Sequence, residues 1–396
     1  MDTTEKRPEV LLIGMGGVGV LYAFILQNGG ANVTAVCRSN YEAVRDRGID
    51  VISDKFGEHT RWRPTRVARS PEDVRDIQFD FVVCTFKNVP DVVSDADVVR
   101  PYLERSAAHR PARLPYVVLL QNGIDFEQET HEALCTGPSP LAGGIISGVN
   151  WVGVTLVGQG SRIEHGLLEA MTVGAYPCPI EQPVAPEHVA AVQRFVDIAR
   201  AGGSQTTLSD DMIATRWRKI TWNISWGGLT TLARRPVMEL LQPETLPYSL
   251  GVVRGIMLEM MAIVRASGIG EDRVPAQIVD DNTFLTLKST PAKLRISRSP
   301  DAFLESKADT LRADFKPSIL VDLERSRPME LEVIFTNMLR RARQYNVETP
   351  RLDMIVAALK PSQLEFVRSA RGMSADPSAE CDLHPRGHIT AGAPVL

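Results

Sequence analysis

The sequence has few cysteines and no stretch that is long and apolar enough to cross a bilayer. Its five cysteines, Cys37, Cys84, Cys135, Cys178 and Cys381, are scattered over 396 residues and show no C-x-x-C spacing. This pattern argues against a disulfide framework and a structural zinc site, and it favours a reducing compartment. No apolar run approaches the roughly 20 residues that a membrane-spanning helix needs. The polar start MDTTEKRPEV is not typical of a secretory signal. We therefore expect a cytoplasmic protein without a membrane partner or a metal site.

The chain also lacks the excess of basic residues that proteins binding nucleic acid carry. Lys and Arg number 44 against 48 Asp and Glu, which gives a net charge of −4 and a pI near 6.0. This balance offers no electrostatic attraction to nucleic acid or to an anionic membrane. The hydrophobic fraction of 44% and the charged fraction of 23% are normal for a soluble globular protein. A chain of 396 residues suits two domains.

The first half of the chain alternates short apolar runs with helical patterns. The segments EVLLIG, NVTAVC, FDFVVCTF and YVVLLQNG are typical of buried parallel strands. Between the first two lies VGVLYAFILQNGG, which fits a helix that ends at Gly29 and Gly30. Strands separated by helices predict βαβ units and a doubly wound α/β sheet. The glycine-broken segment 148–174 predicts two or three extended segments that join this sheet in antiparallel fashion.

Near Ser209 the pattern becomes mostly helical. Long helical patterns such as SLGVVRGIMLEMMAIVRASG and MELEVIFTNMLRRARQYN follow, and Ser209 or Asp210 is the candidate N-cap of the first helix. We therefore predict an N-terminal domain over residues 1–208 and an all-helical C-terminal domain over residues 209–371. The polar stretch near 289–317 predicts a connection. Residues 372–396 are rich in small and turn-forming residues, which predicts a disordered tail.

A glycine-rich motif joins the first predicted strand to the helix that follows it. Residues 14–19, GMGGVG, have the form G-x-G-x-x-G. In this form Gly14 permits a tight turn, Gly16 lets the backbone approach a pyrophosphate, and Gly19 allows close packing of helix on strand. The helix start at Gly17 and Val18 offers free amides and a positive dipole end to an anion. The motif predicts a Rossmann-type dinucleotide-binding domain, and the alternative is a glycine-rich turn without a ligand.

The end of the second predicted strand indicates which dinucleotide binds. NAD sites usually carry Asp or Glu at this place. Here the strand runs into Arg38, Ser39 and Asn40, without an acid. An arginine suits the 2′-phosphate of NADP through charge-assisted and bidentate hydrogen bonds. The sequence therefore favours NADPH over NADH, with a solvated surface arginine as the alternative interpretation of Arg38.

Two further strand ends carry polar residues where ligands of open α/β sheets bind. FVVCTFKN delivers Lys87, and VVLLQNG delivers Asn122. Farther along, WRKITWN carries Lys219 and Asn223 on a predicted helix. With the glycine motif, these segments resemble the ketopantoate reductase family, whose second domain opens with a W-x-K-x-x-x-N helix. The resemblance runs over about residues 9–360.

The second predicted domain continues this resemblance. SILVDLERSRPME, with Ser318 and Glu330, is similar to the family pattern S-x-x-x-D-x-x-x-x-R-x-x-E, and RRARQYNVETP looks like the family's ending. The resemblance implies NADPH-dependent reduction of a 2-oxo acid to a 2-hydroxy acid. Within the family this is the conversion of ketopantoate to pantoate in pantothenate biosynthesis. The resemblance also suggests a homodimer.

This chemistry accounts for a lysine and an asparagine on one helix. Hydride that arrives at a ketone carbon leaves an alkoxide that must be protonated. Lys219 can stabilise that charge and donate the proton. Asn223 follows four residues later, so both side chains point from one helix face. The implied roles are catalysis for Lys219, Glu330 and Asn122, cofactor binding for Lys87 and Asn122, and substrate binding for Asn223, Ser318 and Lys219.

Each of these candidates also has a structural interpretation. A helical lysine is most often a surface charge, and an asparagine such as Asn223 can serve helix packing alone. Glu330 could pair on the surface with Arg327 or Arg340. The three tryptophans around Lys219 are expected to pack rather than to take part in chemistry.

One departure from the family pattern weakens the prediction of the substrate. The family helix usually carries a second asparagine four residues after the first, and this chain has Gly227 there. A glycine deletes a polar contact and opens space, so a bulkier 2-oxo acid or carbonyl compound is the alternative substrate. A non-catalytic NADPH-binding sensor or interaction module is the alternative from another class. Lys219 and Glu330 argue against it, because a binding module needs neither.

Overall fold

The computed structural model describes residues 6–38, 40–104, 113–288 and 315–373. The chain divides into two compact units. The first contains the described residues up to Asn88 and from Val93 to Arg216; the second contains Val89–Val92 and the described residues from Trp217 onward. Most of the predicted connection and of the predicted tail, at 289–314 and 374–396, lies outside the described residues. The domain boundaries predicted at 208 and 371 stay predictions.

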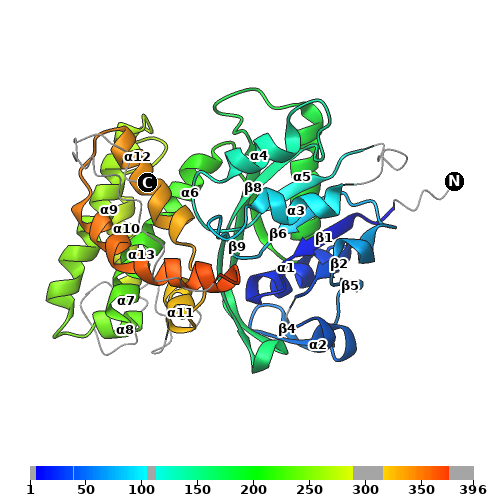
Figure 1. The fold of residues 1–396 in the computed structure, drawn as a ribbon, viewed down its shortest axis with the longest axis horizontal. Helices are drawn as coiled ribbons and strands as arrows, with labels where there is room; N and C mark the ends of the chain where they lie inside the picture. Colours follow the sequence, from blue (N-terminus) through cyan, green and yellow to red (C-terminus); the bar gives the residue numbers. More distant parts are fainter. Residues whose placement is uncertain (1–5, 39, 105–112, 289–314, 374–396) are drawn as a thin grey trace, which may run out of the picture. The chain divides into compact units, whose positions relative to one another are not determined.

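Within the described residues, the first unit is built on a ten-stranded sheet with the order β4-β3-β9-β8-β7-β6-β1-β2-β5, and β10 pairs with β9 (Figure 1). The four predicted buried strands form its parallel centre, with β1 between β2 and β6, and β7 beyond β6. Their side chains are almost all buried, as β-branched runs predict. The strands are β1 (Glu9–Ile13), β2 (Asn32–Val36), β6 (Phe81–Cys84) and β7 (Tyr116–Leu119).

Two long strands confirm the predicted antiparallel addition in part, because they pair with each other in antiparallel register while the first of them joins the centre of the sheet in parallel register. β8 (Gly144–Val157) pairs with β9 (Arg162–Tyr176) in antiparallel register, and β8 joins the parallel centre through β7. Four short strands, which the sequence pattern did not predict, complete the sheet. They are β3 (Ile49–Ser53), β4 (Gly57–Trp62), β5 (Arg66–Ala68) and β10 (Gln205–Leu208).

Helices of the first unit bury their apolar residues against this sheet. α1 (Gly17–Asn28) has Gly29 as its C-cap, where the sequence predicts the end of the helix. All its residues from Gly19 to Leu26 are buried, because α1 contacts both the sheet and α5 (Pro186–Ala201). This burial of apolar surface is the main source of stability. The other helical segments are α2 (Tyr41–Asp46), η1 (Pro71–Val74), α3 (Asp95–Leu103), α4 (Glu127–Cys135) and η3 (Gly158–Gly160).

The described residues of the second unit form helices and no strand, which confirms the predicted helical C-terminal part. None of the helices in the described part of the chain has both the length and the apolar character that a membrane crossing needs. The helices are α6 (Met212–Trp222), which begins in the first unit, η4 (Asn223–Gly227), α7 (Gly228–Ala233), α8 (Val237–Leu240), α9 (Leu246–Ala266), α10 (Ile278–Lys288), α11 (Ser318–Glu324), η5 (Glu332–Thr336), α12 (Asn337–Gln344) and α13 (Pro350–Ala370).

The N-cap of α6 differs from the sequence prediction by one or two residues. Asp211 is the cap, since its Oδ1 accepts a hydrogen bond from the Ala214 amide at 2.9 Å. The predicted cap at Ser209 or Asp210 is therefore wrong. Ser209 instead accepts from the Asp211 amide at 3.1 Å and so stabilises the turn before the cap.

Three histidines of the first unit have pKa values that burial lowers. His165 Nε2 lies 3.0 Å from the Leu168 carbonyl oxygen, so this nitrogen carries the proton. His165 Nδ1 then accepts from the Ser53 hydroxyl at 2.7 Å. Burial lowers the pKa of His165, and likewise of His131 and His188, below the ordinary value of 6.5. The folded state thus holds these imidazoles neutral.

We predict that the free energy of unfolding falls between about pH 7.5 and about pH 5.5. The unfolded chain binds protons on these histidines near pH 6.5, whereas the folded chain binds them only at lower pH. The stabilisation that comes from these neutral histidines is therefore complete above pH 6.5. It is lost as the pH falls through the pKa values of the folded state. Urea midpoints measure the difference, which His165→Gln should reduce and the exposed control His59→Gln should not. Equal midpoints of the native chain at both pH values would contradict this account.

Candidate functional site

The turn between β1 and α1 has the geometry of an anion cradle. Gly14 has a φ of 107°, and a Cβ there would lie 2.4 Å from the Phe86 backbone nitrogen, so only glycine fits. A Cβ at Gly19 would lie 1.9 Å from the Gly14 carbonyl oxygen, which shows how closely the helix approaches the turn. Gly16 is exposed, and a Cβ there would have no heavy atom within 4 Å. The open space at Gly16 suits a pyrophosphate.

The start of α1 adds the electrostatic part of this cradle. The helix begins at Gly17 and carries no acidic residue in its first turn. In the first turn of a helix no preceding turn offers a carbonyl oxygen. The amides of Gly17 and Val18 therefore have no acceptor within the helix. These amides and the helix dipole favour an anion at this point.

Side-chain hydrogen bonds connect the turn to two neighbouring strand ends. Thr85, after β6, donates from Oγ1 to the Gly14 carbonyl oxygen at 2.8 Å. Asn40, after β2, donates from Nδ2 to the Met15 carbonyl oxygen at 3.1 Å. Arg38 is exposed in the same segment after β2. This segment is therefore held beside the cradle, with Arg38 accessible to a ligand.

A buried carboxylate, Asp95 in the first turn of α3, connects the loops after β6 and β7. Asn88 Nδ2 donates to Asp95 Oδ2 at 3.0 Å, and Gln121 Nε2 donates to Oδ1 at 2.9 Å. Lys87 is exposed directly before Asn88, and Asn122 is half-buried directly after Gln121. The structure thus brings the segments of the predicted cofactor residues to the carboxyl edge of the sheet.

A buried arginine that the sequence analysis missed stabilises the turn after β7. Arg216, on α6, is 4% exposed, and its Nη1 donates to the carbonyl oxygens of Gln121 at 2.9 Å and Gly123 at 3.3 Å. These two carbonyl groups stand on either side of Asn122. Arg216 also forms an ion pair with Glu127, which is itself buried. The guanidinium therefore fixes the backbone that carries Asn122.

Lys219 lies on α6 one turn before Asn223, where the helix passes into the π-helical segment η4. Both residues are half-buried. Burial lowers the pKa of Lys219 to about 8, because loss of solvation disfavours the ammonium form. Trp217 and Trp226 are fully buried, as expected of packing residues. Lys219 is therefore not the freely solvated surface charge of the structural interpretation.

Glu330 and Ser318 lie on elements that neighbour the Lys219 helix within the second unit. Glu330 is only 3% exposed and directly precedes the helix that contains η5. η5 contacts η4, and so does α11, which begins at the exposed Ser318. π-helical segments occur frequently at functional sites. Asn223 and Ser318 therefore lie on contacting elements, Lys219 lies one turn before Asn223, and Glu330 lies two residues before η5.

The two arginines that could have paired with Glu330 on the surface bind other carboxylates. Arg327 forms an ion pair with Asp322 at 2.6 Å, and Arg340 forms one with Glu332 at 3.3 Å. Glu330 itself is only 3% exposed, so it is not a surface residue.

Gly227 leaves room for a small side chain at the position where the family pattern has asparagine. A Cβ there would lie 3.9 Å from Pro317 Cβ and 4.0 Å from Ile319 Cγ2, which are ordinary contacts. The glycine is buried but is not required by the backbone, since its φ of −59° is helical.

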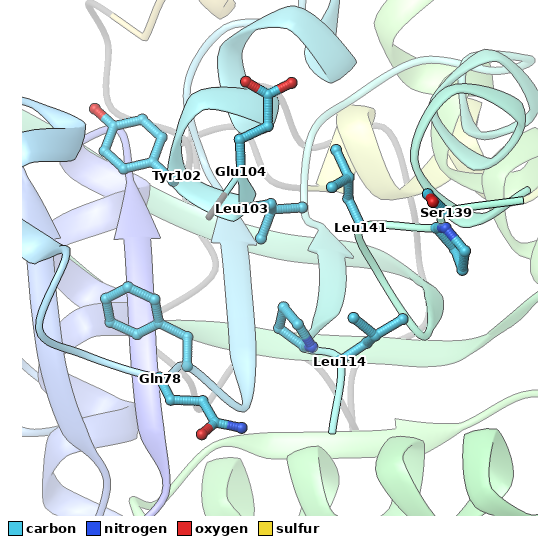
Figure 2. A pocket seen from close by; sticks show the side chains of 10 residues that line it. Gln78, Tyr102, Leu103, Glu104, Leu114, Ser139 and Leu141 are labelled. Atoms are coloured by element: carbon cyan, nitrogen blue, oxygen red, sulfur yellow. The ribbon is translucent and has the colours of Figure 1, made fainter. Parts of the chain in front are cut away.

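A surface hollow of the first unit lies at the other edge of the sheet. Figure 2 shows the side chains that surround it, among them Tyr102 and Glu104 of the α3 region. Gln78 and Leu114, which also line it, stand before β6 and β7, at the amino ends of these strands. The lining contains none of the residues predicted for cofactor or substrate. This hollow is not the predicted site.

Two family sequence models match the chain. Residues 10–177 match the model described as "Ketopantoate reductase PanE/ApbA", and residues 211–363 match "Ketopantoate reductase PanE/ApbA C terminal". These ranges cover most of the chain and confirm the resemblance drawn from its motifs.

Individual relatives agree with these matches. The chain is 27% identical over 361 residues to the uncharacterized protein YDL144C of Saccharomyces cerevisiae, with 87% of this chain and 91% of that protein covered. The crystal structure of 2-dehydropantoate 2-reductase from Methylococcus capsulatus is 27% identical with a TM-score of 0.67, and 90% and 97% of the two chains are covered. D-mandelate dehydrogenase, in a ternary structure with NADH and anilino(oxo)acetate, shares the fold at 17% identity and a TM-score of 0.66, with 90% and 99% covered.

We predict that Arg216→Met lowers the free energy of unfolding by about 3 to 5 kcal/mol, because the buried carboxylate of Glu127 would lose its ion pair. Urea denaturation measures this loss. The matched control is Arg218→Met, which changes an exposed arginine two residues away on the same helix and should cost about 1 kcal/mol or less. Equal losses in the two variants would show that the buried ion pair has no special weight.

Proposed function

Because this chain belongs to the ketopantoate reductase family and is an oxidoreductase, we propose that it reduces a 2-oxo acid to a 2-hydroxy acid with NADPH. The proposed substrate is ketopantoate and the product is pantoate. The observation that carries the proposal is the half-buried Lys219, whose pKa is lowered to about 8 by loss of solvation. A lysine with this pKa is mostly protonated near neutral pH and still releases its proton readily.

In the proposed reaction NADPH supplies the hydride, and the residues of the chain bind, orient and protonate. Lys219 faces the substrate carbonyl, stabilises the negative charge that develops on its oxygen, and donates the proton. Asn122 binds near the carbonyl and the nicotinamide. Glu330 holds the substrate or orients Lys219. Asn223 and Ser318 bind the substrate, with the Ser318 hydroxyl toward the carboxylate.

The choice of NADPH rests on the end of β2. Arg38 is exposed there, and the residues that follow β2, at 37–40, include no acid that could bind a ribose 2′-hydroxyl. The phosphate cradle at Gly14, Gly16, Gly17, Val18 and Gly19 serves either dinucleotide, and exposed Lys87 adds positive charge after β6. NADH is the alternative cofactor, because the structurally similar D-mandelate dehydrogenase binds NADH.

A bulkier 2-oxo acid is the second candidate substrate, and Gly227 is the observation that favours it. Gly227, the last residue of η4, stands where the family pattern places an asparagine, and the missing side chain would reduce the volume that the protein fills there. The structurally similar D-mandelate dehydrogenase binds anilino(oxo)acetate, a 2-oxo compound with an aromatic ring.

The setting that we propose is the cytoplasm, with pantoate entering pantothenate biosynthesis and a homodimer as the assembly. Four cysteines in the described part of the chain are free thiols, which suits a reducing compartment. Analytical ultracentrifugation of the purified chain tests the dimer.

The experiment that tests the function follows NADPH oxidation by its absorbance, with a panel of 2-oxo acids headed by ketopantoate. Preferred turnover of ketopantoate supports the first candidate, and preferred turnover of an aromatic or larger branched acid supports the second. Tight NADPH binding without turnover of any 2-oxo acid contradicts both.

We predict that Lys219→Ala lowers turnover by about 100-fold or more, on the scale of general acid catalysis, while the NADPH dissociation constant hardly changes. Lys219→Arg keeps the positive charge, but a guanidinium cannot give up its proton, so this variant should lose most of the turnover too. Steady-state kinetics and fluorescence titration measure both quantities. Near-native turnover of the alanine variant would show that another group is the acid.

We predict that Arg38→Ala weakens NADPH binding about tenfold or more, because hydrogen bonds to a charged group contribute about 1.5 to 3 kcal/mol. NADH binding should change little, since NADH has no 2′-phosphate. Arg47→Ala, at an exposed arginine just after α2, is the matched control. If Arg38→Ala weakens both dinucleotides equally, Arg38 does not select the cofactor.

A further inference from the structure

A glutamine side chain binds both polar groups of the Met329 main chain. Gln363, on α13, has no exposed surface. The Met329 amide donates to Gln363 Oε1 at 2.8 Å, and Gln363 Nε2 donates to the Met329 carbonyl oxygen at 3.0 Å. Two hydrogen bonds from one planar carboxamide fix both the position and the tilt of the main chain at this residue.

The residue held in this way stands directly before Glu330. Residues 327–329 belong to no helix or strand, so no regular hydrogen-bond ladder positions Met329. Met329 is fully buried, and its amide and carbonyl groups therefore cannot turn to water instead. Removing Gln363 would leave both groups without these partners, and the chain would have to shift to satisfy them. Glu330 would move with it.

Asp91 sets the orientation of the glutamine. Gln363 Nε2 also donates to Asp91 Oδ2 at 2.9 Å. A carboxylate only accepts hydrogen bonds, so Asp91 selects the amide orientation in which nitrogen faces it. This orientation leaves Oε1 for the Met329 amide. The other oxygen, Asp91 Oδ1, is buried without a hydrogen-bond partner among the described residues, which makes the carboxyl group an unfavourable choice for packing alone.

The charges around Asp91 do not compensate for the missing hydrogen bond at Oδ1. Burial raises the pKa of Asp91, the hydrogen bond from Gln363 opposes that change, nearby Glu332 raises it further, and Lys360 lowers it. Glu332 is already paired with Lys360 and Arg340. A role in orienting Gln363 explains why a carboxyl group stands at this position.

We propose that Gln363 and Asp91 are positioning residues for Glu330. Gln363 holds the peptide before Glu330, and Asp91 holds Gln363 in the orientation that permits both hydrogen bonds. The inference rests on the proposed function, in which Glu330 acts on the substrate. Asp91 also lies four residues after Lys87. The segment that is proposed to bind the cofactor is therefore followed in sequence by the residue that is proposed to orient Gln363.

The test compares four variants of the full-length chain. Gln363→Met keeps the length of the side chain and removes all three hydrogen bonds, so turnover should fall about tenfold or more through misplacement of Glu330. The NADPH dissociation constant should stay within about twofold of the native value. Asp91→Ala should lower turnover as well, whereas Asp91→Asn keeps an accepting oxygen and should retain most of it. The double variant Gln363→Met/Asp91→Ala should be no worse than Gln363→Met alone, because both act through one contact.

Two controls separate a positioning role from a loss of folding and from a failure of the proposed function. Gln344→Met makes the same change at an exposed glutamine and should leave turnover unchanged. Turnover is expressed per NADPH-binding site, so an unfolded fraction does not count. If Glu330→Gln abolishes turnover but Gln363→Met keeps it, the positioning role is wrong and the proposed function stands. If Glu330→Gln keeps full turnover, the proposed role of Glu330 is wrong, and the inference falls with it.

Discussion

The parallel pairing of β7, β6, β1 and β2 is the constraint on which the first unit depends. Parallel strands all run in one direction, so the chain leaves each of them at the same edge of the sheet. This brings together the glycine turn, Arg38, Lys87 and Asn122, which lie far apart in the sequence. Side-chain hydrogen bonds then hold the loops in place, with Asp95 between the loops after β6 and β7. The sheet places these residues at a common edge, and buried polar contacts fix the conformation of the loops that carry them.

In the second unit, burial lowers the pKa of Lys219. α6 and η4 bury Trp217 and Trp226 completely on either side of Lys219 in sequence. Thr221 and Ser225 turn their hydroxyls back to main-chain carbonyl oxygens of the same helix, at 2.9 and 2.7 Å, so the helix can be buried without leaving these groups unpaired. Desolvation then brings the lysine pKa to about 8. Packing that contributes to stability thus also lowers the pKa of Lys219 toward neutral pH, as the proposed role of this lysine as proton donor requires.

Local sequence pattern predicted the parts of the structure that local pattern determines. The apolar runs of β1, β2, β6 and β7, the glycine end of α1 and the helical character after Ser209 all follow from periodicity and turn chemistry, and the structure confirms them. The family resemblance extends this to the candidate residues, and the sequence models of the family confirm the family itself.

The features that the sequence did not reveal depend on contacts between distant residues. In the sequence Arg216 does not differ from the other arginines of predicted helices. Only the fold shows that its guanidinium donates hydrogen bonds to carbonyl oxygens more than 90 residues away. Gln363 meets Met329 across 34 residues and Asp91 across 272. β4 is exposed along most of its length and β5 has only three residues, so neither offers the buried apolar run that marks β1 and β2. The passage from α6 into η4 has no proline at which a helix would kink, and it became visible only in the fold.

The most direct test of the central claim is the pH dependence of turnover at saturating NADPH and 2-oxo acid, measured from about pH 6 to about pH 10. If Lys219 donates the proton, only its ammonium form is active, so turnover should be constant at low pH and fall as the pH rises through about 8. Turnover that stays constant to about pH 10 would contradict the assignment of Lys219 as the acid.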